Sequence, residues 1–334
     1  MSAATSVELP ASARARSGRG RTPRVSVALP VYNGERYLAL ALDSLLGQTY
    51  EDFELIISDN ASTDATEEIC RGYAARDTRI SYHRNSENRG AAWNFNHAFS
   101  LSTGEYFRWA CYDDLCAPTH LETLVGELDA SPAEVVLCYT KTRLIGEDGE
   151  FVEDYEDLLD LREERPRQRL VHLLHGLRYA HPTYGLMRRA AVAQTRLHGG
   201  YPADDLVWLG EMALLGQWRE VPERLFYRRL HPEISTRANT TREQMAAWCD
   251  PANEGKIVTE AWRLTAEFLR AIHRTPMSRA ERAATYATFL PVYVRASRKQ
   301  LAREAMEVSV AAVGRPLTRL ARRVRVTSSG GRLG

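Results

Sequence analysis

The sequence of 334 residues has no run of about 18 apolar residues, and its N-terminus lacks the apolar segment of a signal peptide. We therefore expect a cytoplasmic protein without membrane spans. The five cysteines show no spacing typical of a metal site, which indicates reduced thiols. Neither GxGxxG after the first predicted strand nor GxxxxGK[ST] is present, so neither a dinucleotide-binding domain nor a P-loop is predicted.

Charge is unevenly distributed along the chain, although the net charge is only +1. Residues 1–24 carry five Arg and one Glu, and residues 315–334 carry six Arg and no acid. Residues 25–314 therefore carry a net charge of −9, which argues against nucleic acid as a partner. We predict disordered basic tails over residues 1–23 and 315–334. The C-terminal tail could also contact an anionic membrane surface, at the inner face of the membrane.

Between the tails, predicted strands alternate with predicted amphipathic helices. This rhythm is typical of βαβ units and predicts an α/β fold, with a mostly parallel central sheet flanked by helices. The charge-dense residues 153–165 are predicted to form an exposed connection, and the chain is helical from about residue 241. The main predicted elements are the strands Val25–Leu29, Phe53–Ser58, Ile80–His83, Glu105–Ala110 and Glu134–Lys141, and the helices Glu35–Gly47, Ala65–Ala75, Pro118–Ala130 and Asp204–Leu215.

Two adjacent carboxylates, Asp113 and Asp114, follow the predicted strand Glu105–Ala110. In an open α/β sheet, ligands bind at the carboxyl ends of the strands. Two acids at that edge can hold a hard divalent cation, which in turn can hold phosphate oxygens. The alternative is a solvated acid pair or a helix N-cap.

Five motifs follow one another along the chain: Val25–Asn33, Ser44–Phe53, Leu55–Thr63, Asn88–Phe99 and Tyr112–Asp114. Together they resemble the family 2 glycosyltransferases with the GT-A fold, in the family's order and over about residues 24–232. The resemblance implies inverting transfer of a sugar from a nucleotide-diphospho-sugar to an acceptor hydroxyl, in the synthesis of cell-surface polysaccharide or glycoconjugates. It implies a catalytic domain over 24–232, with a nucleotide-binding half (24–115) and an acceptor half (116–232), then a helical extension over 233–314.

The resemblance also assigns the residues that contact the nucleotide sugar. Tyr32 can stack on the nucleobase, Asp59 can accept a hydrogen bond from a base N–H, and Arg89 can neutralise a diphosphate. The alternatives are a loop aromatic covering the core, a turn or cap residue, and a surface arginine. The full set is Pro30, Val31, Tyr32, Asn33, Asp59, Asn60, Arg89 and Asp113.

The metal and catalytic residues follow from the same resemblance. Asp114 is in register with the last acid of the family's DxD-type motif, which implies a ligand to Mn²⁺ or Mg²⁺, and Asp113 would contact the ribose or a metal-bound water. His231 matches a family position near the diphosphate and the metal. Asp204 and Asp205 resemble the family's Glu-Asp pair, and we assign Asp205 as the general base. Helix-capping acids are the alternative for this pair.

Two other functions remain open from the sequence. A sugar nucleotidyltransferase would need a basic, glycine-rich phosphate loop, whereas residues 30–34 contain one Gly and no Lys or Arg. A non-catalytic sugar-nucleotide-binding protein of the same fold is the second alternative. The expected partners are a nucleotide-diphospho-sugar, a glycan or lipid-linked acceptor and a second copy of the chain. His181 and Trp208 are candidates for lining the acceptor pocket, with core packing as the alternative for Trp208.

Overall fold

The computed structural model describes residues 22–256 and 258–328. Within these ranges, side chains are described through residue 310. The tail predicted over residues 1–23 therefore lies almost wholly outside the described residues, as do the side chains of the tail predicted over 315–334. Within the described ranges, no helix is both long and apolar enough to cross a membrane.

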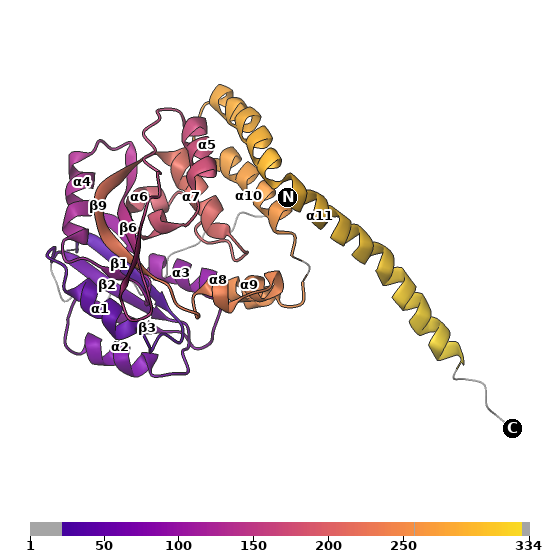
Figure 1. Cartoon of the computed structure of the whole chain (residues 1–334), viewed down its shortest axis with the longest axis horizontal. Coiled ribbons are helices and arrows are strands. Elements are labelled where there is room, and N and C mark those ends of the chain that lie inside the picture. The colour runs from indigo at the N-terminus through magenta and orange to yellow at the C-terminus, as the bar shows by residue number, and fades with distance from the viewer. Residues whose placement is uncertain (1–21, 257, 329–334) are drawn as a thin grey trace.

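The described strands form one mixed nine-stranded sheet in the order β3-β2-β1-β4-β8-β6-β9-β5, with β7 beside β6. Figure 1 labels β1, β2, β3, β6 and β9 among them. The first four strands pair in parallel, as predicted, whereas β8 pairs antiparallel with both β4 and β6. The parallel prediction thus holds for the N-terminal half of the sheet, and the other half is mixed. The strands are β1 (Val25–Val31), β2 (Phe53–Asp59), β3 (Ile80–Arg84), β4 (Tyr106–Trp109), β5 (Leu115–Cys116), β6 (Val135–Ile145), β7 (Phe151–Tyr155), β8 (Leu186–Arg188) and β9 (Gln217–Arg229).

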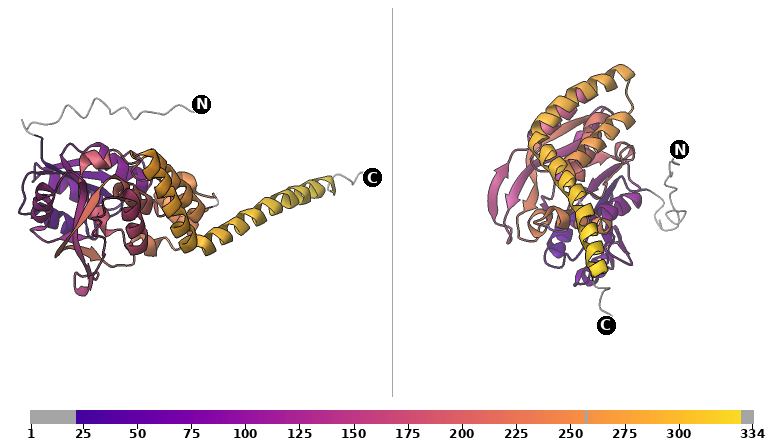
Figure 2. Two further views of the ribbon diagram at one scale, coloured as in Figure 1. Left: turned by 90° about the horizontal axis from the view of Figure 1, so that it is seen from above. Right: turned by 90° about the vertical axis from the view of Figure 1, so that its right-hand side faces the viewer.

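Helices flank the sheet, and α7 begins and ends where the sequence predicted it. The C-terminal part of α11 extends away from the body in Figures 1 and 2. The helices are α1 (Leu38–Leu46), α2 (Thr66–Ala74), α3 (Ala91–Ser100), α4 (His120–Ala130), α5 (Pro166–Gly176), α6 (Arg189–Val192), α7 (Asp204–Leu215), α8 (Ser235–Ala238), α9 (Arg242–Cys249), α10 (Glu260–Arg274) and α11 (Arg279–Ser328), with 3-10 turns at His181–Tyr184 and Pro251–Asn253.

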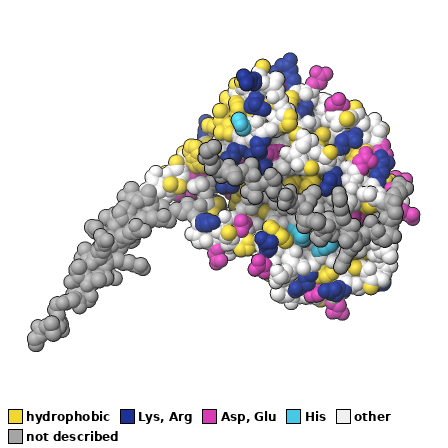
Figure 3. All heavy atoms as spheres, turned by 180° about the vertical axis from the view of Figure 1, so that it is seen from behind, with side chains coloured by type: hydrophobic (Ala, Val, Ile, Leu, Met, Phe, Trp, Pro, Cys, Tyr) yellow, Lys and Arg dark blue, Asp and Glu magenta, His cyan; other side chains and the backbone are white. Residues whose placement is uncertain are grey.

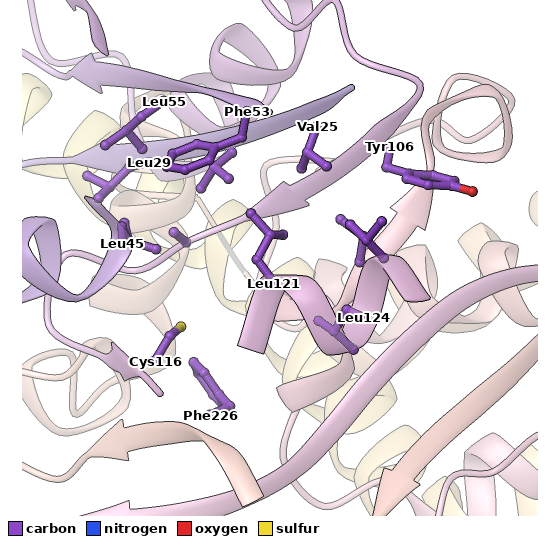
Figure 4. Packing of buried hydrophobic residues seen from close by; sticks show 14 of the residues in the cluster. Val25, Leu29, Leu45, Phe53, Leu55, Tyr106, Cys116, Leu121, Leu124 and Phe226 are labelled. Atoms are coloured by element: carbon purple, nitrogen blue, oxygen red, sulfur yellow. The ribbon is translucent and has the colours of Figure 1, made fainter. Parts of the chain in front are cut away.

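The core has one layer on each face of the sheet, because successive side chains of a strand point to opposite faces. Val25, Val27 and Leu29 of β1 pack with α1 and α4, a layer seen from close by in Figure 4. Ala28 points to the other face and packs with residues of α3 and α7. Both faces are covered, so the site must lie at an edge of the sheet.

The C-terminal helices α10 and α11 pack against α5 and α7. Phe268 of α10 is fully buried against Phe289 and Tyr293 of α11. The same cluster includes Leu170 of α5 and Val207 of α7. Because α7 carries the Asp204–Asp205 pair at its N-terminus, this cluster also supports one side of the predicted active site.

Replacing Phe268 by Ala is expected to lower the free energy of unfolding by about 3–5 kcal/mol, because the substitution removes a buried ring and leaves a cavity. Urea denaturation measures the change. Arg270→Ala, on the exposed side of the same helix, is the control and is expected to change it by less than about 0.5 kcal/mol. Equal stabilities of the two variants would contradict this packing.

The prediction of an exposed connection over residues 153–165 is confirmed only in part, because the segment begins in a strand and three of its later residues are buried. Phe151–Tyr155 forms β7, which pairs with β6. Asp157, Leu159 and Leu161 that follow are all buried, at no more than 4% exposure. Buried and exposed positions alternate over residues 156–161, and the three buried side chains anchor this segment to the body of the protein.

The surface carries both signs of charge. Seen from behind, Lys and Arg side chains are interspersed with Asp and Glu over the described part of this face (Figure 3).

Candidate active site

The predicted site lies where parallel strands end side by side. Val31, the last residue of β1, is paired with Asp59, the last residue of β2, and Ala28 of β1 is paired with Trp109, the last residue of β4. Two cavities open there, of about 480 Å³ and 450 Å³. We call the first the Asn-lined cavity, after Asn33, Asn60, Asn88, Asn94 and Asn239, and the second the Asp-lined cavity, after Asp113, Asp114, Asp204 and Asp205.

A larger cavity of about 850 Å³ lies between α5, α7, α10 and α11. Its lining is mainly apolar and contains no carboxylate pair, so the chemistry belongs to the Asp-lined cavity. The two cavities adjoin, because both are lined by Ala203 and Glu260.

Most of the predicted nucleotide-binding residues come together in the Asn-lined cavity. Tyr32 is 40% exposed and lines this cavity, so its side chain is accessible to a ligand. Asn33 adopts a left-handed backbone conformation (φ 49°), and its Oδ1 accepts a hydrogen bond from the Thr63 backbone N–H at 2.8 Å. The predicted residues that line the cavity are Pro30, Val31, Tyr32, Asn33, Asn60 and Asp113.

Two predicted nucleotide ligands do not line this cavity. Asp59 is fully buried, where its oxygens accept hydrogen bonds from the Ser62 backbone N–H at 2.9 Å and the Tyr82 hydroxyl at 2.6 Å. This is the geometry of the turn residue considered as the alternative. Arg89 places its guanidinium 4.2 Å from the ring centre of Trp93, outside the cavity. The backbone N–H of Arg89 donates to Asn60 Oδ1, so Arg89 supports a side chain that lines the cavity but does not line the cavity itself.

The Asp113–Asp114 pair is held by β9, because β5 pairs with that strand immediately after the two acids. The backbone N–H of Arg229 donates to Asp114 Oδ1 at 2.9 Å, and its guanidinium Nε donates to the backbone oxygen of Asp113 at 2.9 Å. His231 is buried, with Nε2 3.0 Å from Asp113 Oδ2. The structure thus brings His231 to the acid pair, as the resemblance implied.

These acids form a compact group of possible metal ligands. One ligand atom each from Cys111, Asp113 and Asp114 lies within 4.8 Å of the others. Burial and the neighbouring Asp113 charge raise the pKa of Asp114 to about 7. A divalent cation would favour the charged form of a carboxyl whose pKa is raised by burial and by a second acid. The residues therefore fit such an ion.

The Asp204–Asp205 pair begins α7, and its two acids have different surroundings. Both oxygens of Asp204 are engaged, since the backbone N–H groups of Gly199 and Gly200 donate to it at 2.7 and 3.1 Å and His198 Nδ1 lies at 3.3 Å. Asp205 accepts from the backbone N–H of Leu206 at 2.9 Å. Burial and the Asp204 charge raise the pKa of Asp205, which makes it the better-suited proton acceptor.

Neither candidate for the acceptor pocket lines it directly. Trp208 is buried in the core against Trp109, which is the alternative considered from the sequence. His181 is 2% exposed and lies beneath the cavity wall.

Sequence reasoning did not identify three of the residues that line the two cavities. Cys111 lines both cavities, and Arg228 faces the Asp-lined cavity from β9. Trp248 of α9, 42% exposed, also lines both, although residues after 232 were assigned to a separate extension. Alternation along β9 could have separated Arg228 from its buried neighbour Arg229, but α8 and α9 carry no motif that marks them.

Comparisons with known proteins identify the class to which this fold and site belong. The model of the family "Glycosyl transferase family 2" matches residues 26–195, and the chain belongs to this family. Solved structures of S. aureus TarS residues 1–349 show the same GT-A fold at 17–18% identity. The complex with UDP has a TM-score of 0.59 and covers 83% of this chain and 73% of TarS; the complex with UDP-GlcNAc has a TM-score of 0.60 and covers 84% and 79%.

Curated relatives match over a shorter segment. EpsE of Bacillus subtilis (strain 168), named as a candidate glycosyltransferase, is 43% identical over 108 residues, which are 32% of this chain and 39% of EpsE. The glycosyltransferase GlyG of Streptococcus pneumoniae serotype 4 is 34% identical over 113 residues, 34% of this chain and 38% of GlyG. The matched segment thus spans under two fifths of either relative.

Proposed function

We propose that this glycosyltransferase moves a sugar from a nucleotide-diphospho-sugar to an acceptor hydroxyl with inversion of the anomeric centre. One observation carries the proposal: two carboxylate pairs from distant segments, Asp113–Asp114 and Asp204–Asp205, line one cavity together with Arg228. Such an arrangement allows one pair to serve the leaving diphosphate and the other to serve the acceptor.

The nucleotide would occupy the Asn-lined cavity, with its base on the exposed ring of Tyr32 and its polar groups on Asn33 and Asn60. The cavity shares Cys111 and Asp113 with the Asp-lined cavity, so a diphosphate could pass from one to the other. The TarS complexes with UDP and UDP-GlcNAc, on the same fold, support this choice of donor class. Asp59 and Arg89 would act indirectly, by shaping the wall.

A divalent cation, Mn²⁺ or Mg²⁺, would be held by Asp114 and Asp113, with Cys111 and His231 beside them. When bound, it supplies Lewis-acid stabilisation of the charge on the diphosphate. Arg228 adds positive charge at the same cavity.

Asp205 would remove the proton from the acceptor hydroxyl as that oxygen attacks the anomeric carbon in line. Its raised pKa makes it a stronger base than an ordinary Asp, and Asp204 contributes by repulsion while it holds the 198–200 loop in place. The nucleoside diphosphate leaves from the opposite face of the sugar, so the transfer inverts the configuration.

The acceptor would be a glycan or a lipid-linked glycan in cell-surface polysaccharide synthesis. The apolar 850 Å³ cavity supports an acceptor with a lipid portion, because it adjoins the Asp-lined cavity at Ala203 and Glu260. Membrane contact through residues 315–334 stays a prediction, since their side chains lie outside the described residues, and so does the homodimer.

A thermal-shift panel of UDP-, GDP- and dTDP-sugars with Mn²⁺ tests the proposal. One nucleotide sugar is expected to raise the melting temperature, since a ligand at 100 times its Kd stabilises the native state by about 2.7 kcal/mol. Asp114→Asn is expected to remove the Mn²⁺-dependent part of this shift. No shift with any donor would contradict the proposal, and binding without turnover would favour a non-catalytic binding protein.

A further inference from the structure

Arg228 lines the Asp-lined cavity, and its guanidinium is held by neighbouring side chains without forming an ion pair within the described part of the chain. Its Nη1 lies 3.1 Å from His181 Nε2, and its Cζ lies 4.8 Å from the ring centre of Tyr179. Among the described residues, no carboxylate oxygen lies within 4.0 Å of its guanidinium nitrogens, although five carboxylates, the four Asp and Glu260, line the same cavity. A guanidinium without an ion-pair partner keeps its charge available for an anionic ligand.

The hydrogen bonds around His181 define its protonation. A guanidinium can only donate, so His181 Nε2 must be the acceptor and Nδ1 must carry the proton. Nδ1 lies 3.0 and 3.1 Å from the two oxygens of Asp157, to which it donates. Burial lowers the pKa of His181, with Arg228 adding to the effect against the opposing Asp157 carboxylate. The imidazole is therefore neutral, as the bond from Arg228 requires.

Asp157 is at the far end of the hydrogen-bonded series Arg228–His181–Asp157, and the fold fixes its position. Asp157 is 4% exposed, and its Oδ2 lies 3.3 Å from the Thr142 hydroxyl of β6. The His181 ring is enclosed by Tyr155 at 5.1 Å and by Tyr179 at 5.3 Å between ring centres. The ring cannot turn without breaking buried hydrogen bonds, so Arg228 receives one orientation.

We propose that Asp157 and His181 are positioning residues that aim Arg228 at the diphosphate of the donor. An Arg without this neighbour, in a cavity lined by five acids, would pair with one of them, and the site would lose a cation and a carboxylate together. The neutral imidazole directs the guanidinium and leaves its charge for the ligand. This inference rests on the proposed function, because it takes the anion to be a nucleoside diphosphate.

Two substitutions at His181 separate positioning from packing. Asn places its amide near the Nδ1 position and keeps the donor to Asp157, but it cannot reach Arg228. Gln extends to the Nε2 position and can still accept from Arg228. With Mn²⁺ and UDP, GDP or dTDP, whichever binds, calorimetry should give about a tenfold weaker affinity for His181→Asn. His181→Gln should remain within about threefold of the parent.

A double-mutant cycle makes the link to Arg228 explicit. Arg228→Gln alone should weaken binding about tenfold or more, and His181→Asn should cost nothing further in that background. The matched control is His120, which is also buried and whose Nδ1 lies 2.9 Å from Arg108 Nη1, away from both cavities. His120→Gln should change thermal stability but leave the diphosphate affinity unchanged.

The outcomes distinguish the two proposals. Independent, additive losses from His181→Asn and Arg228→Gln, or parental affinity in His181→Asn, would overturn the positioning role alone. Failure of every nucleoside diphosphate to bind the parent protein would overturn the proposed function and this inference with it. If His181→Asn does not fold, the variant Asp157→Asn/His181→Phe, which removes the buried charge together with its partner, is held to the same tenfold loss.

Discussion

Asp205→Asn is expected to lower the rate of sugar transfer by about 10²–10⁴-fold, the range typical for loss of a general base. The amide cannot take the proton of the acceptor hydroxyl at the moment of attack. Donor binding should stay within about threefold of the parent, because the nucleotide cavity is lined by other segments. Single-turnover kinetics together with calorimetry of donor binding separate the two effects.

The neighbouring acid provides the matched control for this prediction. Asp204 accepts hydrogen bonds from Gly199 and Gly200, so Asp204→Asn should mainly lower the free energy of unfolding, by about 1–3 kcal/mol. Its effect on the rate should be much smaller than that of Asp205→Asn. Transfer at the parental rate by Asp205→Asn, or an equal loss in both variants, would show that the base is assigned wrongly.

Removing divalent cations with EDTA is expected to reduce turnover about 10³-fold or more, because several kcal/mol of charge stabilisation at the diphosphate is lost. Added Mn²⁺ or Mg²⁺ should restore it. Asp114→Asn should raise the Mn²⁺ concentration needed for half-maximal rate, since it replaces a charged candidate ligand. Glu87→Gln, an exposed acid on a nearby loop, is the control. Full activity after exhaustive chelation would contradict the proposal that a divalent cation assists the transfer.

The sequence predicted the architecture well, because local patterns determine it. Apolar β-branched runs identified β1 and β2 within two residues, and the periodicity of Asp204–Leu215 matched α7 at both ends. The edge that carries Asp113 and Asp114 follows from the topology of parallel strands alone. These features depend on residues close together in the sequence, where propensity and periodicity are informative.

What the sequence could not supply was the pairing of distant side chains. Asp59 looked like a ligand, but β3 pairs with β2 and brings Tyr82 onto its carboxylate. Asp157 looked like part of a charged connection, yet it is buried and accepts a hydrogen bond from His181, 24 residues later. Polar residues at a strand end can face the cavity or the core, and contacts with residues distant in the sequence determine which of the two they face.

The most direct test of the central claim is the configuration of the sugar that leaves the donor. With Mn²⁺ and the α-linked nucleotide sugar that binds, proton NMR recorded before mutarotation identifies the first-formed anomer in the product or in slowly hydrolysed donor. A single in-line displacement assisted by Asp205 predicts the β anomer, and Asp205→Asn should slow its appearance. An α anomer as the first product would contradict the account.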